Sequence, residues 1–186
     1  MEHFILTPTC RLVLQEGDLT RVEVGAIVNA ANRRMLGGGG VDGAIHAVAG
    51  PELRAACEAV PEVQPGVRCP TGEARITPGF GLKCDHIIHT VGPVYHSEER
   101  SAPLLVSAYK ASLALANEHG VETIAFPAIS CGVFHYPMED AAQLALLTCR
   151  DHAGGLREIR FVLFGEKDYG RWLAVTRGIL DPAPAP

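Results

Sequence analysis

Residues 27–50, IVNAANRRMLGGGGVDGAIHAVAG, contain the most informative pattern in the sequence. It begins as an apolar run typical of a strand covered on both faces, and it ends in a short helical segment. Between them lie four consecutive glycines, which weaken helices and strands and let the main chain approach a ligand closely. A helix N-terminus attracts anions through its free N–H groups and its dipole. We therefore favour an anion-binding loop over a flexible surface turn.

On both sides of residues 27–50, strand-like and helix-like segments alternate, which predicts the α/β class. We expect strands at residues 11–15, 26–30, 73–77, 85–91, 123–128 and 159–164. We expect helices after the glycines, from Pro51, over 103–118, from Pro137 to the glycines at 154–155, and over 168–179. We expect a single domain over residues 1–180 and a frayed proline-rich tail over 181–186.

Composition narrows the class of protein. The chain has 186 residues, 47% of them hydrophobic, and a formal net charge of -5, which disfavours non-specific nucleic-acid binding. No apolar run approaches the roughly 18 residues of a membrane span, and the N-terminal segment does not resemble a secretory signal. The six cysteines form no C-x-x-C pair and are not clustered with histidines as zinc ligands are. We expect reduced thiols, no metal or cofactor, no membrane partner and a cytoplasmic location.

A second loop follows the strand expected at 123–128, in the segment FPAISCGVFHYP at residues 126–137. Small residues at a strand end are typical of ligand sites in open α/β sheets. Taken alone, this segment is equally consistent with a tight loop whose aromatic side chains enter the core. Two glycine-containing loops at strand ends together favour a site that grips a diphosphate from both sides.

The segments GDLT, AIVNAAN, LGGGGVDGAIH, HTVGPVY and FPAISCGVFHYP, in this order, resemble the macrodomain family, and specifically its MacroD-type branch. The resemblance spans about residues 11–175, nearly the whole chain. It implies a mixed, mostly parallel sheet sandwiched between helices, with ADP-ribose as the ligand. Ala47 departs from the family pattern, because relatives usually carry a basic residue there, and a peripheral contact is thereby in doubt.

The resemblance also implies roles for individual residues. Asp18, followed by Leu19 in the same turn, would accept a hydrogen bond from the adenine amino group, and Phe164 would stack near adenine. Asn32 would bond the distal ribose, and Asn29 would brace the loop. The diphosphate would be held by the main chain of two runs: Gly38, Gly39, Gly40 and Val41, and Ser130, Cys131, Gly132, Val133 and Phe134. Phe134 would also press on the distal ribose. From the residues alone, Asp18 fits equally well as a turn cap and Phe164 as a core aromatic.

Asp42 is the candidate for chemistry, because in the resembled branch this position lies beside the distal ribose. The alternative is an acid that only stabilises the first helical turn through the helix dipole. His46 lies four residues on, so it shares a helical face with Asp42 and would orient it or lie in the core. Either Asp42 or a substrate phosphate would activate the attacking water. A thiol nucleophile at Cys131, near His135, ranks lower because the resembled loop uses its main chain there.

The resemblance to the MacroD-type branch, with Asp42 at the matching position, implies a hydrolase that removes mono-ADP-ribose from acidic side chains of proteins and deacetylates O-acetyl-ADP-ribose. The main alternative is a non-catalytic reader of ADP-ribose or ADP-ribosylated proteins. The presence of Asp42 next to the glycine loop disfavours this alternative. A second alternative is an RNA-interacting module, which the acidic balance disfavours. The sequence leaves open which ADP-ribosyl ester is the natural substrate and what the oligomeric state is.

Overall fold

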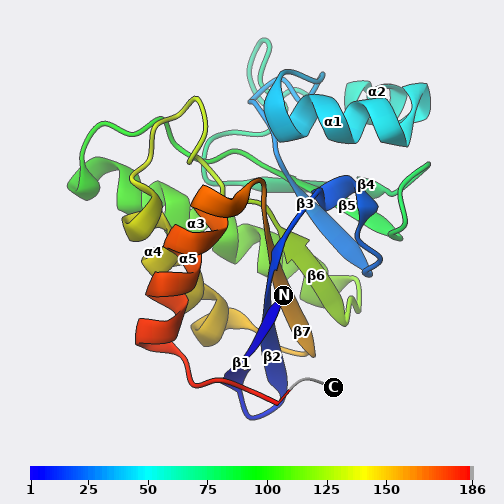
Figure 1. The fold of residues 1–186 in the computed structure, drawn as a ribbon. Coiled ribbons are helices and arrows are strands. Elements are labelled where there is room, and N and C mark those ends of the chain that lie inside the picture. Colours follow the sequence, from blue (N-terminus) through cyan, green and yellow to red (C-terminus); the bar gives the residue numbers. More distant parts are fainter. Residues whose placement is uncertain (185–186) are drawn as a thin grey trace.

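The computed structural model describes residues 1–184 and contains a seven-stranded mixed sheet in the order β1-β2-β7-β6-β3-β5-β4. Neighbours from β2 to β5 in this order are parallel, whereas β1 is antiparallel to β2 and β4 is antiparallel to β5 (Figure 1). The α/β class and the mixed, mostly parallel sheet are therefore confirmed. The strands are β1 Glu2–Thr7, β2 Cys10–Glu16, β3 Ala26–Ala30, β4 Ala74–Pro78, β5 His86–Thr90, β6 Thr123–Phe126 and β7 Glu158–Leu163.

Helices cover both faces of the sheet (Figure 1). One face carries α1 (Gly40–Ala49) and α2 (Pro51–Glu58), and the other carries α3 (Glu98–Glu118), α4 (Met138–His152) and α5 (Glu166–Ile179). A one-turn 3-10 helix, η1 (Leu19–Arg21), follows β2. Each face has its own core of buried apolar side chains. None of the helices in residues 1–184 combines the length and apolar character that crossing a bilayer requires.

The central strand β3 is buried on both faces, which explains its continuous apolar run in the sequence. Its side chains alternate between the two cores: Val28 packs with the core under α3–α5, and Ile27 packs with the core under α1 and α2. Because Asn29 is two residues beyond Ile27, its side chain lies on the α1–α2 face. A fully buried polar side chain is thus directed from the middle of the sheet toward the start of α1.

The start of one helix was expected at the wrong residue, and one strand was not expected. Helix α3 begins at Glu98, not at Pro103, because Ser97 accepts a hydrogen bond from the main-chain N–H of Arg100 and caps the helix one turn earlier. Pro103 is therefore inside the helix. Strand β1 was not expected at all; it pairs with β2 along the edge of the sheet.

The C-terminal segment also differs from the expected frayed tail. The carbonyl of Asp181 accepts a hydrogen bond from Ile5, and the N–H of Ala183 donates to His3, so this segment pairs with the open edge of β1. An edge strand presents unpaired N–H and C=O groups, which explains why the chain returns to it. The remainder of the expected tail, residues 185–186, lies outside the described residues.

Candidate functional site

The expected site residues follow four adjacent strands. Strands β2, β7, β6 and β3 are parallel neighbours, so their carboxyl ends lie at one edge of the sheet. Beyond these ends come Asp18, Phe164, Ser130 and Gly38, in the spatial order of the strands. Three inter-strand spacings give this row a length of about 14 Å. Sequence segments more than a hundred residues apart are thereby brought into one elongated site.

The glycine loop ends in helix α1 with its main-chain donors free. The helix N-cap, Gly39, has no side chain that could satisfy them, and no hydrogen bond within residues 1–184 uses the main-chain N–H groups of Gly38, Gly39, Gly40 or Val41. A Cβ atom on Gly38 would lie 3.0 Å from Asp42 Oδ2 and 3.2 Å from Asn32 Nδ2. A side chain at position 38 would therefore crowd both Asp42 and Asn32.

Asp42 is buried in the first turn of α1, with 4% of its surface exposed. Its Oδ1 accepts a hydrogen bond from Asn29 Nδ2 over 2.7 Å, and its Oδ2 has no partner among the described residues. Burial raises the pKa of Asp42 above its usual value, while the Asn29 hydrogen bond and the nearby His46 oppose that rise. A carboxylate with one oxygen fixed and the other free, next to the glycine loop, can accept a proton or hold a water molecule.

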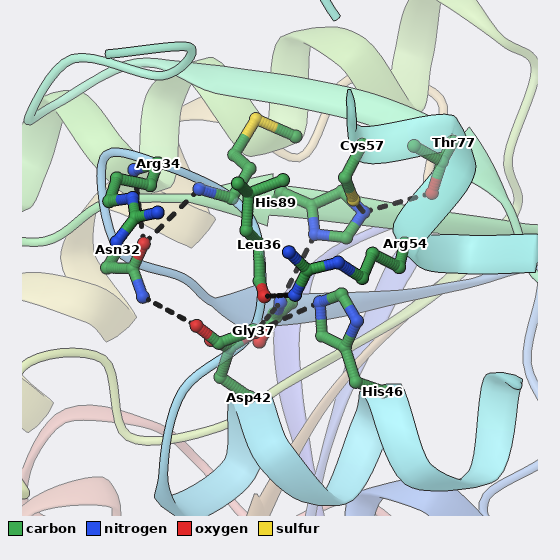
Figure 2. A network of polar contacts seen from close by, with 12 residues as sticks. Asn32, Arg34, Leu36, Gly37, Asp42, His46, Arg54, Cys57, Thr77 and His89 are labelled. Atoms are coloured by element: carbon green, nitrogen blue, oxygen red, sulfur yellow. Dashed lines mark hydrogen bonds and ion pairs between the residues drawn. The ribbon is translucent and has the colours of Figure 1, made fainter. Parts of the chain in front are cut away.

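Asn29 and Asn32 form hydrogen bonds with different partners from those expected from the sequence. Asn29 does not hold the glycine loop, because its strand directs it to Asp42 and to the buried His89. The loop is braced by Asn32 instead: its Nδ2 donates to Gly37 O over 3.0 Å, and its Oδ1 accepts from the N–H groups of Arg34 and Met35 (Figure 2). A side-chain amide carries two N–H donors, so Asn32 retains one for a ligand.

His46 lies one helical turn after Asp42, with its Nε2 3.5 Å from Asp42 Oδ1. This Nε2 forms no hydrogen bond to any part of the chain that the structure describes. The ring also lies beneath Gly37, and it lines a hollow of about 450 Å³ together with Gly38 and Arg54. His46 is close enough to influence the charge of Asp42 without fixing its orientation.

The second loop presents another row of free donors. The main-chain N–H groups of Gly132, Val133 and Phe134 take part in no hydrogen bond within the described chain. Val133 is 86% exposed, and Phe134 is partly exposed. Ser130 adopts a left-handed backbone conformation, with φ of 66°, and is buried. Such strain in a non-glycine residue persists only where the surroundings enforce it, and it is often found at functional sites.

The far end of the row contains Asp18, Leu19 and Phe164. Asp18 Oδ1 caps η1 by accepting hydrogen bonds from Thr20 N and Thr20 Oγ1, and these bonds lower its pKa. Leu19 is buried in the core, so only its main chain is available to a ligand. Asp18 also lines a hollow of about 560 Å³ that includes Gln15 and Arg160. Phe164 lies beyond the end of β7 and is 86% exposed, which excludes the core alternative for this aromatic ring.

Cys131 is unsuited to nucleophilic attack. Burial raises the pKa of its thiol to about 12, so the reactive thiolate is scarce at neutral pH. No group of three or more potential metal ligands occurs within residues 1–184. Of the two candidates for chemistry named from the sequence, the Asp42 carboxylate is therefore better suited than the Cys131 thiol.

Known proteins share both this arrangement and its sequence. The family model described as Macro domain matches residues 28–145. A macro domain-containing protein of Xanthomonas campestris is 56% identical over 142 residues, which are 76% of this chain and 79% of that protein. The chain belongs to the macrodomain family.

Solved macrodomain structures agree with this assignment. A macrodomain of Oceanobacillus iheyensis, solved with ADP, is 40% identical to this macrodomain with a TM-score of 0.89, covering 96% of this chain and 95% of that one. A Trypanosoma brucei macrodomain in complex with ADP-ribose is 40% identical with a TM-score of 0.76, covering 87% of this chain and 67% of that one. The resemblance inferred from the sequence is confirmed at the level of the family; the ligand roles of single residues stay predictions.

Sequence reasoning missed several residues that shape the site of this macrodomain. Gly92 lies where a Cβ atom would come within 2.6 Å of Ile129, so the loop after β5 packs directly under the Ser130 loop. The N–H of Tyr95 donates to Phe134 O, and its ring contacts Tyr136. These residues lie in two family motifs, HTVGPVY and FPAISCGVFHYP, whose contact with each other the sequence does not reveal.

Behind the asparagines lies a buried polar chain that was also missed. Asn29, His89 and Thr77 occupy three neighbouring strands, β3, β5 and β4, and are linked by hydrogen bonds. Figure 2 shows the contact between His89 and Thr77. The signal in the sequence was a histidine in the otherwise apolar strand segment HIIHT. A polar side chain in a buried strand needs partners, and these could have been sought on the adjacent strands.

Proposed function

We propose that this macrodomain binds ADP-ribose and hydrolyses the ester that links its distal ribose to an acidic protein side chain or to an acetyl group. The row of loops supports an extended ligand, with adenine near Asp18 and Phe164 and the distal ribose near Asn32 and Asp42. The relatives solved with ADP and with ADP-ribose support the same ligand class. The partners are then free ADP-ribose, O-acetyl-ADP-ribose and mono-ADP-ribosylated proteins.

The diphosphate would lie between the two loops with free N–H groups. Its negative charge suits oriented main-chain donors and the positive end of the α1 dipole. The nearby arginines contribute little, because Arg33 and Arg34 are exposed and Arg54 is engaged by Leu36 O and Glu58. Binding through amides explains how a chain with a net charge of -5 can take an anionic ligand.

Hydrolysis adds water across the ester. The water oxygen forms a bond to the acyl carbon or to the distal ribose carbon, the bond from that carbon to the ester oxygen breaks, and the departing oxygen gains a proton. Asp42 is the protein group suited to take the proton from water, since its Oδ2 is free and burial raises its pKa. A phosphate oxygen of the substrate is the alternative acceptor.

One observation carries this proposal: a buried carboxylate is fixed by Asn29 through one oxygen, while the other oxygen faces the glycine loop. A first-turn acid that served only the helix dipole would need neither burial nor a partner from the central strand. The same geometry argues against a protein that only reads the modification.

The test is incubation of the protein with a glutamate-linked mono-ADP-ribosylated protein and with O-acetyl-ADP-ribose. We expect release of free ADP-ribose from both, because the two esters are alike at the reacting centre. Retention of the modified protein with tight binding and no release would establish a reader and overturn the hydrolase proposal. The experiment also ranks the two substrates by their kcat/KM.

A further inference from the structure

A continuous chain of buried polar groups crosses the sheet and ends at the Asp42 carboxylate. It runs from Thr77 on β4 to His89 on β5 and Asn29 on β3, and then to Asp42 on α1. Asn29 and His89 are register partners in neighbouring parallel strands. All four residues are buried, so water does not compete for their hydrogen bonds. Figure 2 shows His89 and Thr77 joined by a dashed line, with Asp42 on the neighbouring helix α1.

The hydrogen bond to Thr77 decides which nitrogen of His89 carries the proton. Thr77 Oγ1 lies 3.2 Å from the carbonyl oxygen of Pro78 and 2.9 Å from His89 Nε2, and Cys57 Sγ lies 3.9 Å from the same nitrogen. When the Thr77 hydroxyl donates to Pro78 O, its oxygen accepts from His89 Nε2. Burial lowers the pKa of His89 to about 3, and the ring is therefore neutral with a single proton. With that proton on Nε2, Nδ1 is an acceptor.

Because His89 Nδ1 is an acceptor, the Asn29 amide faces it with its nitrogen and not with its oxygen. Asn29 Nδ2 lies 3.1 Å from His89 Nδ1 and 2.7 Å from Asp42 Oδ1, so its two hydrogens serve these two acceptors. If His89 carried its proton on Nδ1 instead, the Asn29 amide would have to turn its oxygen toward the ring. That oxygen would then face the Asp42 carboxylate, and two acceptors would repel each other.

We propose that His89 is a positioning residue, which Thr77 holds in the Nε2-protonated tautomer so that Asn29 presents a donor to Asp42. Its effect on turnover rests on the proposed function, whereas its effect on the Asp42 carboxylate does not. The expected consequence is that loss of the Thr77 hydroxyl alters Asp42, although Thr77 and Asp42 do not touch. The alternative is a polar cluster that only stabilises the core.

The experiment compares Thr77→Val, which keeps the shape of the side chain but removes the hydroxyl, with Thr77→Ser, which keeps the hydroxyl. The matched control is Thr148→Val in α4, because Thr148 is 6% exposed, Thr77 is 5% exposed, and the Thr148 hydroxyl serves only its own helix. Nitrogen NMR of the histidine rings reports the tautomer of His89, and carbon NMR reports the titration of the Asp42 carboxyl. Hydrolysis rates and the Kd for ADP-ribose are measured on the same proteins.

In the unaltered protein we expect His89 protonated on Nε2 only. In Thr77→Val we expect that tautomer to be lost, the Asp42 pKa to rise further, and kcat to fall on the order of 10²-fold through misplacement of Asp42. The Kd for ADP-ribose should change little, and Thr77→Ser should restore all three properties. Thr148→Val should change only the melting temperature.

An unchanged tautomer and an unchanged Asp42 pKa in folded Thr77→Val would overturn the proposal, whatever the activity. Equal losses of kcat in Thr77→Val and Thr77→Ser would do the same, since the hydroxyl would not matter. If the unaltered protein hydrolysed neither ester, the proposed function would fail, and the two NMR measurements would still decide whether His89 positions Asn29 and Asp42.

Discussion

Asn29 donates a 2.7 Å hydrogen bond to Asp42 and thereby ties the central strand of the sheet to the first turn of the helix that follows the glycine loop. Both residues are buried. A buried carboxylate is unfavourable in its charged form unless it is hydrogen-bonded. The hydrogen bond from Asn29 therefore favours the charged form of Asp42, which can accept a proton. The second oxygen of Asp42 stays available beside Gly38.

Replacement of Asp42 by asparagine should abolish turnover with little effect on ligand affinity. General-base assistance is typically worth about 10² to 10⁴ in rate, and we expect kcat to fall by that order. Calorimetry with free ADP-ribose, run beside the hydrolysis assay, separates the two effects. Asp140→Asn is the matched control, because Asp140 is also an acid in a first helical turn but is exposed. Undiminished turnover in Asp42→Asn would leave the substrate phosphate as the base.

The same substitution should change how stability depends on pH. Burial raises the pKa of Asp42 in the folded protein, so the folded state binds this proton more tightly than the unfolded state does. The resulting stability is present below the unfolded pKa and is lost as the pH rises through the folded pKa. Thermal unfolding should therefore show Asp42→Asn gaining melting temperature relative to the unaltered protein as the pH rises from acidic to neutral. A constant difference across this range would contradict the assignment.

Asn32→Ala should damage both binding and turnover. The substitution removes the brace of the glycine loop at Gly37 and the N–H that we assign to the distal ribose. We expect losses of roughly tenfold or more in affinity and in kcat. Asn117→Ala is a control with similar bracing far from the site, since Asn117 holds the turn after α4 through Ala153 and Gly155. If both variants lost only stability, Asn32 would be a structural residue alone.

Phe164→Ala should weaken ADP-ribose binding without changing the rate of the bound ester. Stacking of a base on an aromatic ring is worth about 1–3 kcal/mol, or roughly 5- to 150-fold in Kd. Phe164 is free to stack because it lies exposed beyond β7. Phe80→Ala provides the comparison, as Phe80 is another exposed phenylalanine. Equal affinities of the two variants would remove Phe164 from the adenine site.

Affinity for ADP-ribose should depend only weakly on salt. Main-chain donors act at short range and release few counterions, whereas a cluster of arginines would make binding strongly salt-dependent. Titrations at low and at moderately high sodium chloride check this. A steep loss of affinity on raising the salt would indicate a cationic site and would contradict binding of the diphosphate through main-chain amides.

The sequence predicted the strands of the central sheet well, because their apolar runs are long and bounded by turn residues. Strand β3 was expected at residues 26–30, where the structure has it. The start of α3 was misjudged because Pro103 suggested a first-turn position, while Ser97 and two glutamates give the better start signal. Strand β1 lies at the edge of the sheet and only two of its six residues are buried, so its sequence lacks the continuous apolar run of the inner strands.

The sequence predicted which site residues lie together when they are close in the chain. It did not predict contacts between residues that are far apart in the chain. Asp42, His46 and the glycines lie within one segment, and they do lie together. The link from Asn29 to His89 spans 60 residues and depends on the register of two parallel strands, which no local pattern reveals. The different contacts of Asn29 and Asn32 follow from their positions: Asn29 lies in β3 on the face that α1 covers, whereas Asn32 lies in the loop beyond the end of the strand.

The most direct test of the central claim is a calorimetric titration of the unaltered protein with free ADP-ribose. A site built from free main-chain amides of two loops, with Asn32 and Phe164 at its ends, predicts saturable one-to-one binding with measurable heat. A titration without heat at any attainable concentration, confirmed by unchanged amide resonances of Gly38 and Gly132, would contradict it.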